Sequence, residues 1–140
     1  MINILFAGND GVFDGMLTCA LSIFKRSTLD EGVTFYVMTM DVSHLKQTYL
    51  PISDDRIEFF RKVIKSYDER NEVVKLDVSD IYKKEFSGCP NEGAYCSPYT
   101  LIRLFADMIP EMPDKILYLD VDIMFNRDIK LLYDIDVEGY

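Results

Sequence analysis

The sequence predicts a doubly wound α/β domain with a mostly parallel sheet. Strand and helix patterns alternate four times along the 140 residues. The strands are continuous apolar runs without in/out alternation, which is typical of strands covered on both faces. Right-handed crossovers through the intervening helices make such strands parallel. The 49% hydrophobic content suits one domain with a sizeable core, and no repeat, low-complexity segment or internal boundary divides it.

The first half of the chain is expected to hold two strands, each followed by a helix. Residues 2–7 form an apolar run that ends in the turn sequence GNDG, and residues 33–38 form a second run. Asp14 is placed to cap the first helix, and Ser53 with the acidic pair after it opens the second. The apolar stripes at helical spacing are Leu17, Ala20, Leu21 and Phe24 in the first helix, and Ile57, Phe60, Val63 and Ile64 in the second.

The second half repeats this order with a longer connection. Residues 73–78 form the third strand, and the polar stretch 87–96 is a loop. A Ser-Pro pair opens the helix expected at 97–108, because serine caps helices and proline suits their first position. The fourth strand is expected at 116–119, and a short helical turn at 129–133. The apolar residues assigned to the core are Leu101, Leu104, Phe105 and Met108 in the helix, and Ile129, Leu132 and Tyr133 in the turn.

The composition argues against several classes of protein. A net charge of −9, from 15 basic and 24 acidic residues, disfavours a nucleic-acid or anionic-membrane surface. No apolar run approaches the roughly 20 residues of a membrane helix, and the N-terminus has no basic leader of a signal peptide. Cys19, Cys89 and Cys96 are an odd number without export signals, so reduced thiols in the cytoplasm are expected. A metal site at Cys89 and Cys96 lacks further soft ligands nearby.

Two segments lie where ligands bind in such sheets, beyond the carboxyl ends of strands. The first is Asn9-Asp10-Gly11, whose residue types are equally typical of a plain turn. The second is Asp120-Val121-Asp122 after the fourth strand. Residues i and i+2 of an extended chain point the same way, and two carboxylates about 5 Å apart repel by about 3 kcal/mol at an effective dielectric near 20. A hard divalent cation, magnesium or manganese, removes that repulsion and leaves positions for water and phosphate.

Two other interpretations of the acidic pair stay open. It can be a solvated turn whose aspartates cap the next segment of the chain. It also shares spacing with phosphatases of the haloacid-dehalogenase type, in which the first aspartate is a nucleophile. That motif comes after the first strand, however, and Met124 stands here in place of its threonine or valine.

Three segments together resemble family 8 glycosyltransferases, the group that contains bacterial lipopolysaccharide galactosyl- and glucosyltransferases and glycogenin. DKILYLDVDIMFNRDIKLLYDID at 114–136 is similar to the metal-motif region of that family. INILFAGND at 2–10 resembles its opening strand and turn, and SPYTLIRLFADMIPE at 97–111 resembles its Thr-Tyr-x-Arg-Leu helix, with Arg103 at the arginine position. The three matches keep the family's order and span the whole chain.

The resemblance implies a Rossmann-like GT-A fold that transfers a hexose from a UDP-sugar with retention, assisted by Mn²⁺ or Mg²⁺. Residues 1–140 would be the donor-binding part, and the acceptor a glycan or a lipid-linked sugar. By position, Asp120 and Asp122 would be metal ligands, and Arg103 would face the donor sugar or diphosphate unless it is a plain surface residue. The residues expected to bind the nucleotide-sugar are Ala7, Asn9, Asp10, Arg103, Asp120 and Val121.

The sequence also departs from the family. Asparagine stands at position 9, where the family often has aspartate, and family members are longer. We therefore expect a C-terminally incomplete domain that self-associates, with the third metal ligand, the catalytic group and any peripheral membrane contact outside it. His44 is expected at the surface rather than on a metal, and Tyr95 is the loop aromatic to examine for sugar stacking. The alternative function is a truncated or degenerate nucleotide- or sugar-binding module without turnover.

Overall fold

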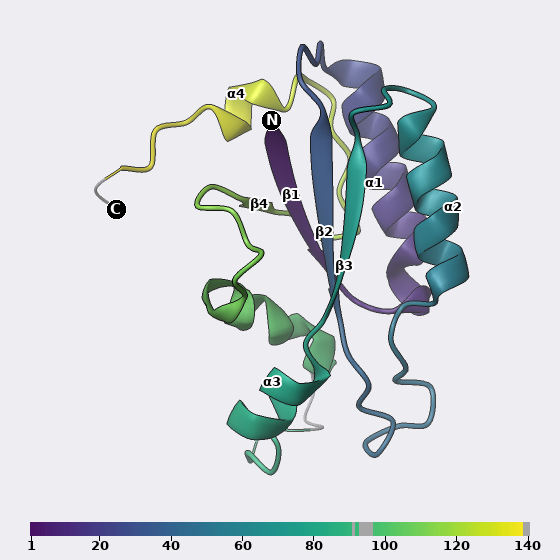
Figure 1. The fold of residues 1–140 in the computed structure, drawn as a ribbon, viewed down its shortest axis with the longest axis vertical. Coiled ribbons are helices and arrows are strands. Elements are labelled where there is room, and N and C mark those ends of the chain that lie inside the picture. The colour runs from purple at the N-terminus through teal and green to yellow at the C-terminus, as the bar shows by residue number, and fades with distance from the viewer. Residues whose placement is uncertain (91, 93–96, 139–140) are drawn as a thin grey trace.

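The computed structural model describes residues 1–90, 92 and 97–138, and its centre is a four-stranded parallel sheet (Figure 1). The strand order is β3-β2-β1-β4. The strands are β1 (Ile2–Ala7), β2 (Val33–Thr39), β3 (Glu72–Asp77) and β4 (Leu117–Tyr118). All three pairings are parallel, so the predicted α/β fold with a parallel sheet is confirmed. The predicted strand bounds differ from the observed ones by at most one residue at each end.

One face of the sheet is covered by α1 (Phe13–Arg26) and α2 (Asp54–Lys65), which lie side by side in Figure 1. Alternate residues of β1, among them Ile4 and Phe6, belong to the core on this face, together with Phe13 and Phe60. The predicted cap of α1 is wrong: Val12 precedes the helix, and Asp14 lies inside its first turn. An acidic group still suits that end because the amide groups there point outward.

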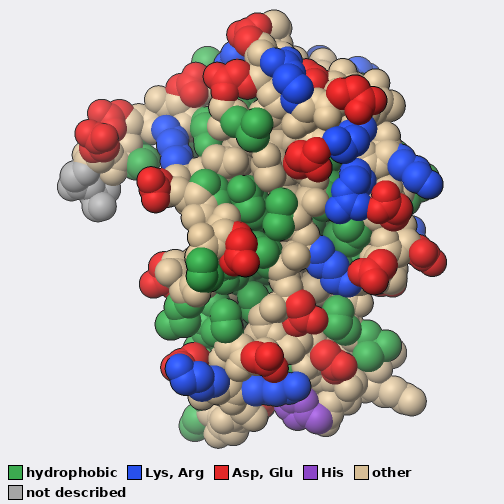
Figure 2. Space-filling model, in the orientation of Figure 1, with side chains coloured by type: hydrophobic (Ala, Val, Ile, Leu, Met, Phe, Trp, Pro, Cys, Tyr) green, Lys and Arg blue, Asp and Glu red, His purple; other side chains and the backbone are tan. Residues whose placement is uncertain are grey.

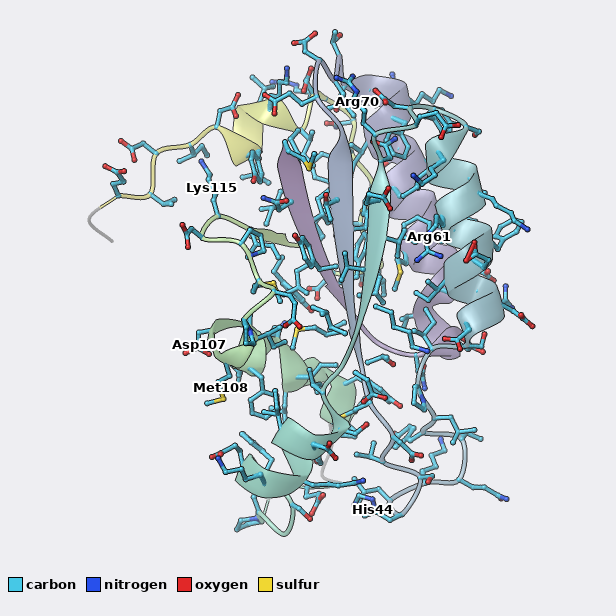
Figure 3. All side chains as sticks on the ribbon, in the orientation of Figure 1. His44, Arg61, Arg70, Asp107, Met108 and Lys115 are labelled. Carbon is cyan, nitrogen blue, oxygen red and sulfur yellow. The ribbon has the colours of Figure 1, made fainter. Side chains whose placement is uncertain are left out.

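The other face is covered by α3 (Ser79–Glu85) and the 3-10 segments η2 (Pro98–Thr100) and η3 (Ile102–Met108). The helix expected at 97–108 is therefore a pair of 3-10 segments. The buried residues of η3 are Ile102 and Phe105, three positions apart, and Ile109, directly after η3, is buried as well. Leu104 is 59% exposed and Met108 52%, which contradicts their place in the predicted stripe. Figure 3 shows Met108 on the outer side of η3.

The chain returns beside β1 after this segment. β4 is two residues long, and the Leu119 amide donates to the Leu5 carbonyl at 3.0 Å. The expected turn is present as α4 (Lys130–Tyr133). Ile129 before it is fully buried, whereas Leu132 is 44% exposed, so its assignment to the core is wrong.

The molecular surface is mixed in charge but contains apolar side chains. Figure 2 shows them gathered on the left of the face that carries β4 and η3, with acidic and basic groups interspersed over α2. Within the described residues, no helix is both long and apolar enough to cross a membrane.

Candidate functional site

A pocket of about 260 Å³ opens at the carboxyl ends of β1 and β4. Four parts of the chain line it: the turn after β1, Tyr49 in the loop after β2, the segment that begins η2, and the end of β4. Four of the predicted donor-binding residues, Ala7, Asn9, Asp120 and Val121, are among its lining residues. The structure thus brings together residues more than a hundred positions apart, at the edge of the sheet where ligands of α/β folds bind.

The turn after β1 is tight and well hydrogen-bonded. Asn9 caps the short 3-10 turn η1 (Asp10–Val12), and its side-chain oxygen accepts from the Gly11 amide at 3.0 Å. A Cβ added at Gly8 would lie 2.2 Å from the side chain of Val12, so only glycine fits there. This wall of the pocket is therefore formed largely by backbone and by the Asn9 amide.

Asp10 lies beside this turn but does not line the pocket. Its carboxylate accepts from the Ser53 amide at 2.8 Å and from the Ser53 hydroxyl at 3.1 Å. Ser53 is the residue before α2, as predicted, but its hydroxyl is used for Asp10 and not for the helix. The observed role of Asp10 is to join the turn after β1 to the start of α2.

Arg103, Tyr118 and Asp120 form a cluster at the opposite wall, in which Tyr118 and Asp120 line the pocket and Arg103 does not. The Tyr118 hydroxyl donates to Oδ1 of Asp120 at 2.8 Å. The Arg103 guanidinium lies over the Tyr118 ring, 5.0 Å from its centre, and one of its nitrogens is 3.9 Å from the same Asp120 oxygen. Burial, with the bond to Asp120, raises the pKa of the Tyr118 hydroxyl, which therefore remains a donor at neutral pH.

The acidic motif itself is held from behind by α1. A Cβ added at Gly15 would come within 2.3 Å of the Val121 carbonyl oxygen, so the first turn of α1 packs directly on the backbone between the two aspartates. Asp122, the next residue, is exposed and does not line the pocket. The two predicted metal ligands thus differ in position: Asp120 faces the pocket, and Asp122 lies outside it at the same bend.

The donor atoms of these two aspartates fit a hard divalent cation, because carboxylate oxygens are what Mg²⁺ and Mn²⁺ prefer. Together they would supply only part of a six-coordinate shell. In the described part of the chain, no group of three or more histidine, cysteine or acidic residues is placed to hold a metal ion. His44 lies in the loop after β2, as Figure 3 shows, with its ring nitrogen 3.3 Å from Glu92. Cys89 is a free thiol, and Cys96 lies outside the described residues.

Three tyrosines of the pocket were not predicted from the sequence. The Tyr99 hydroxyl lies 2.8 Å from the Met40 carbonyl and 2.9 Å from that of Leu50, and burial raises the pKa of Tyr99 to about 12. Tyr49 packs edge-on against the Tyr99 ring. Tyr118 belongs to an apolar strand typical of a core; its only signal is that it precedes Asp120 by two residues and so points the same way. Tyr95, the loop aromatic expected to merit attention, lies outside the described residues.

Comparison with known proteins gives consistent matches. The model of glycosyl transferase family 8 matches residues 3–140. A curated relative, the probable galacturonosyltransferase-like 4 of Arabidopsis thaliana, is 24% identical over 126 residues, which are 89% of this chain and 32% of that protein.

Solved structures agree on the fold. The galactosyltransferase LgtC in complex with donor and acceptor sugar analogues superposes with a TM-score of 0.69 at 21% identity, over 96% of this chain and 43% of that one. An active-site mutant of LgtC gives the same TM-score and identity over 98% of this chain and 43% of that one. Mouse xyloside xylosyltransferase 1 gives 0.53 at 15% identity, over 95% of this chain and 46% of that one. The GT-A fold is confirmed, and the chain spans less than half the length of each of these proteins.

Proposed function

The chain belongs to glycosyl transferase family 8, and we propose that it is the donor-binding part of a retaining hexosyltransferase. The donor is a UDP-sugar, the acceptor is a glycan or a lipid-linked sugar such as lipopolysaccharide, and Mn²⁺ or Mg²⁺ assists through the Asp-x-Asp motif. We place the reaction in the cytoplasm, with no nucleic-acid partner. Residues 1–140 form one unit in this proposal, because both walls of the pocket are built on the same sheet.

One observation carries the proposal: a single pocket holds the backbone turn after β1 on one wall and the Asp120 carboxylate on the other. A nucleotide-sugar needs both kinds of surface. The base requires hydrogen-bonding groups in an apolar recess, which Ala7 and Asn9 offer. The diphosphate requires positive charge, which Arg103 and a cation at Asp120 and Asp122 would provide.

The cation also accounts for anion binding by a protein of charge −9. When bound, it would neutralise the charge that develops on the diphosphate leaving group. The protein residues bind and orient: Val121 contributes its backbone at the bend, and Arg103 offers a planar guanidinium already fixed over Tyr118. Asp10 supports the base-binding turn through its hydrogen bonds from Ser53.

Binding is tested by calorimetry with UDP in the presence of Mn²⁺ and in its absence. We expect Mn²⁺ to strengthen binding and Asp120→Asn to remove that increment. Asp107→Asn is a matched control, because Asp107 is an exposed aspartate on the outer side of η3 (Figure 3). Equal Mn²⁺ dependence in the Asp120→Asn protein contradicts the proposal.

The alternative is a nucleotide- or sugar-binding module without turnover. Binding experiments do not separate the two, since both need the same pocket. Hydrolysis of UDP-galactose and UDP-glucose does, because a transferase slowly passes its sugar to water. Mn²⁺-dependent UDP binding without any such hydrolysis by the whole protein favours the module.

A further inference from the structure

Tyr118 contacts both Asp120, which lines the pocket, and Arg103, which does not, through different parts of its side chain. The hydroxyl donates to Oδ1 of Asp120 at 2.8 Å, and the ring carries the Arg103 guanidinium at 5.0 Å from its centre. Arg103 reaches the same carboxylate oxygen only at 3.9 Å, which is the length of a loose ion pair and not of a hydrogen bond. The tyrosine is therefore the hydrogen-bond partner of Asp120 and the stacking partner of Arg103.

Its own position is fixed by the sheet. Tyr118 pairs with Leu5 of β1, and its ring packs against the core on the face covered by η3. The next residue, Leu119, is buried and hydrogen-bonded to the Leu5 carbonyl. These contacts fix the backbone at the point where the chain leaves the sheet. The Tyr118 hydroxyl and the Asp120 carboxylate therefore lie on the same side of the strand.

We propose that Tyr118 is a positioning residue that orients both Asp120 and Arg103 for binding of the diphosphate. This inference rests on the proposed function and deepens it. The hydroxyl holds Oδ1 of Asp120, and no hydrogen bond from a described residue engages Oδ2. A neutral donor orients the carboxylate without cancelling its charge, so the carboxylate stays available to a cation. The ring meanwhile holds Arg103 beside Asp120 but short of direct hydrogen bonding.

Two substitutions separate these contacts. Tyr118→Phe keeps the ring under Arg103 and removes only the hydroxyl. Tyr118→Leu removes the ring as well, so Arg103 loses its stacking partner and becomes free to pair with Asp120. The control is Tyr67→Phe, because Tyr67 is an exposed tyrosine that stacks on Phe24, away from the pocket.

The measurements are Mn²⁺ affinity in the presence of UDP, read from the electron paramagnetic resonance of free Mn²⁺, and UDP affinity in a chelator. We expect Tyr118→Phe to weaken Mn²⁺ binding about tenfold or more, as removal of a group that orients a metal ligand commonly does. Its metal-free UDP affinity should match the unaltered protein. Tyr118→Leu should lose affinity in both measurements, and Tyr67→Phe in neither.

Each result bears on a different part of the proposal. If the unaltered protein shows no Mn²⁺-dependent UDP binding, the proposed function fails and the role of Tyr118 falls with it. If that binding is present but Tyr118→Phe leaves it unchanged, only the positioning role is overturned. A Tyr118→Phe protein that loses metal-free UDP affinity overturns the assigned division between hydroxyl and ring. Thermal unfolding checks each variant, and if Tyr118→Leu does not fold, Tyr118→Phe alone decides.

Discussion

Gly15→Ala tests whether α1 holds the acidic motif in place. In an ordinary helix this change stabilises the folded protein by up to about 1 kcal/mol, because alanine has the higher helix propensity. Here the new Cβ would lie 2.3 Å from the Val121 carbonyl oxygen. Ordinary contact is about 3.5 Å, so helix and motif must separate by about 1 Å. Overpacking of this kind typically costs about 1–3 kcal/mol.

The unfavourable term is the larger one, and we expect Gly15→Ala to lower the free energy of unfolding by about 1 kcal/mol. Urea denaturation followed by circular dichroism measures this change. Since Val121 stands between Asp120 and Asp122, Mn²⁺-dependent UDP binding should weaken as well. Thr18→Ala is the matched control: it lies on the exposed side of α1 and raises helix propensity without meeting the motif. A Gly15→Ala protein that is stabilised and binds UDP normally would refute the reasoning.

Three further results are expected. Asn71→Ala should lower the free energy of unfolding by about 2–4 kcal/mol, because the buried Asn71 side chain accepts from the Val33 amide and donates to the Ile64 carbonyl. Urea denaturation measures this loss, and a loss below about 1 kcal/mol contradicts the prediction. Hydrogen bonds from Arg70 lower the pKa of Asp68 to about 2 in the folded state. The stability that this pair contributes is therefore present above about pH 4 and lost as the pH falls through 2. An NMR titration that gives an ordinary pKa for Asp68 would contradict this prediction. Apolar side chains in and near α4, including Met124 and Leu131, are exposed, so we expect the chain to associate with a second copy of itself. Light scattering should show this association, and Leu131→Lys should reduce it. A protein that is monomeric at every concentration refutes the prediction.

The central sheet could be predicted because its strands are apolar along almost their whole length. Residues 2–7 and 33–38 are apolar at nearly every position, as strands covered on both faces must be, and the parallel pairing results from the helices between them. The helical stripe of α2 was equally clear. Where the apolar residues were few, as in the seven-residue α3, the pattern was too weak to assign an element.

The 3-10 segments show a different limit. Ile102, Phe105 and Ile109 are as apolar as Leu104 and Met108, and the sequence does not say which set faces inward. Both sets are spaced by three or four residues, so packing against the sheet, and not the pattern, decides which set is buried. At the start of α1 the residue type also misled: Asp14 is a good capping residue, but the helix begins at Phe13 and Asp14 lies in its first turn.

For the candidate site, the sequence identified the charged groups but not their partners. Asp120 and Arg103 were found from motif position, and the structure places them in one cluster. Tyr118 was placed in a buried strand because its neighbours are apolar, and the bond from its hydroxyl to Asp120 was not foreseen. The bonds that the Asp10 carboxylate accepts from Ser53 were not foreseen either. Both differences concern side-chain contacts that a linear pattern does not encode.

The strand order implies a sequence of events in folding. β1, β2 and β3 are neighbours along the chain and in space, whereas β4 joins them only after a long loop closes. The segment after β4 makes equally distant contacts: the Phe125 amide donates to the Ser22 hydroxyl, 103 residues away. Closing such a loop costs more entropy than joining adjacent strands and slows the final step. Refolding experiments should therefore find a three-stranded intermediate that already has α1 and α2 but lacks the pocket at the ends of β1 and β4. The pocket would then be the last part of the fold to form.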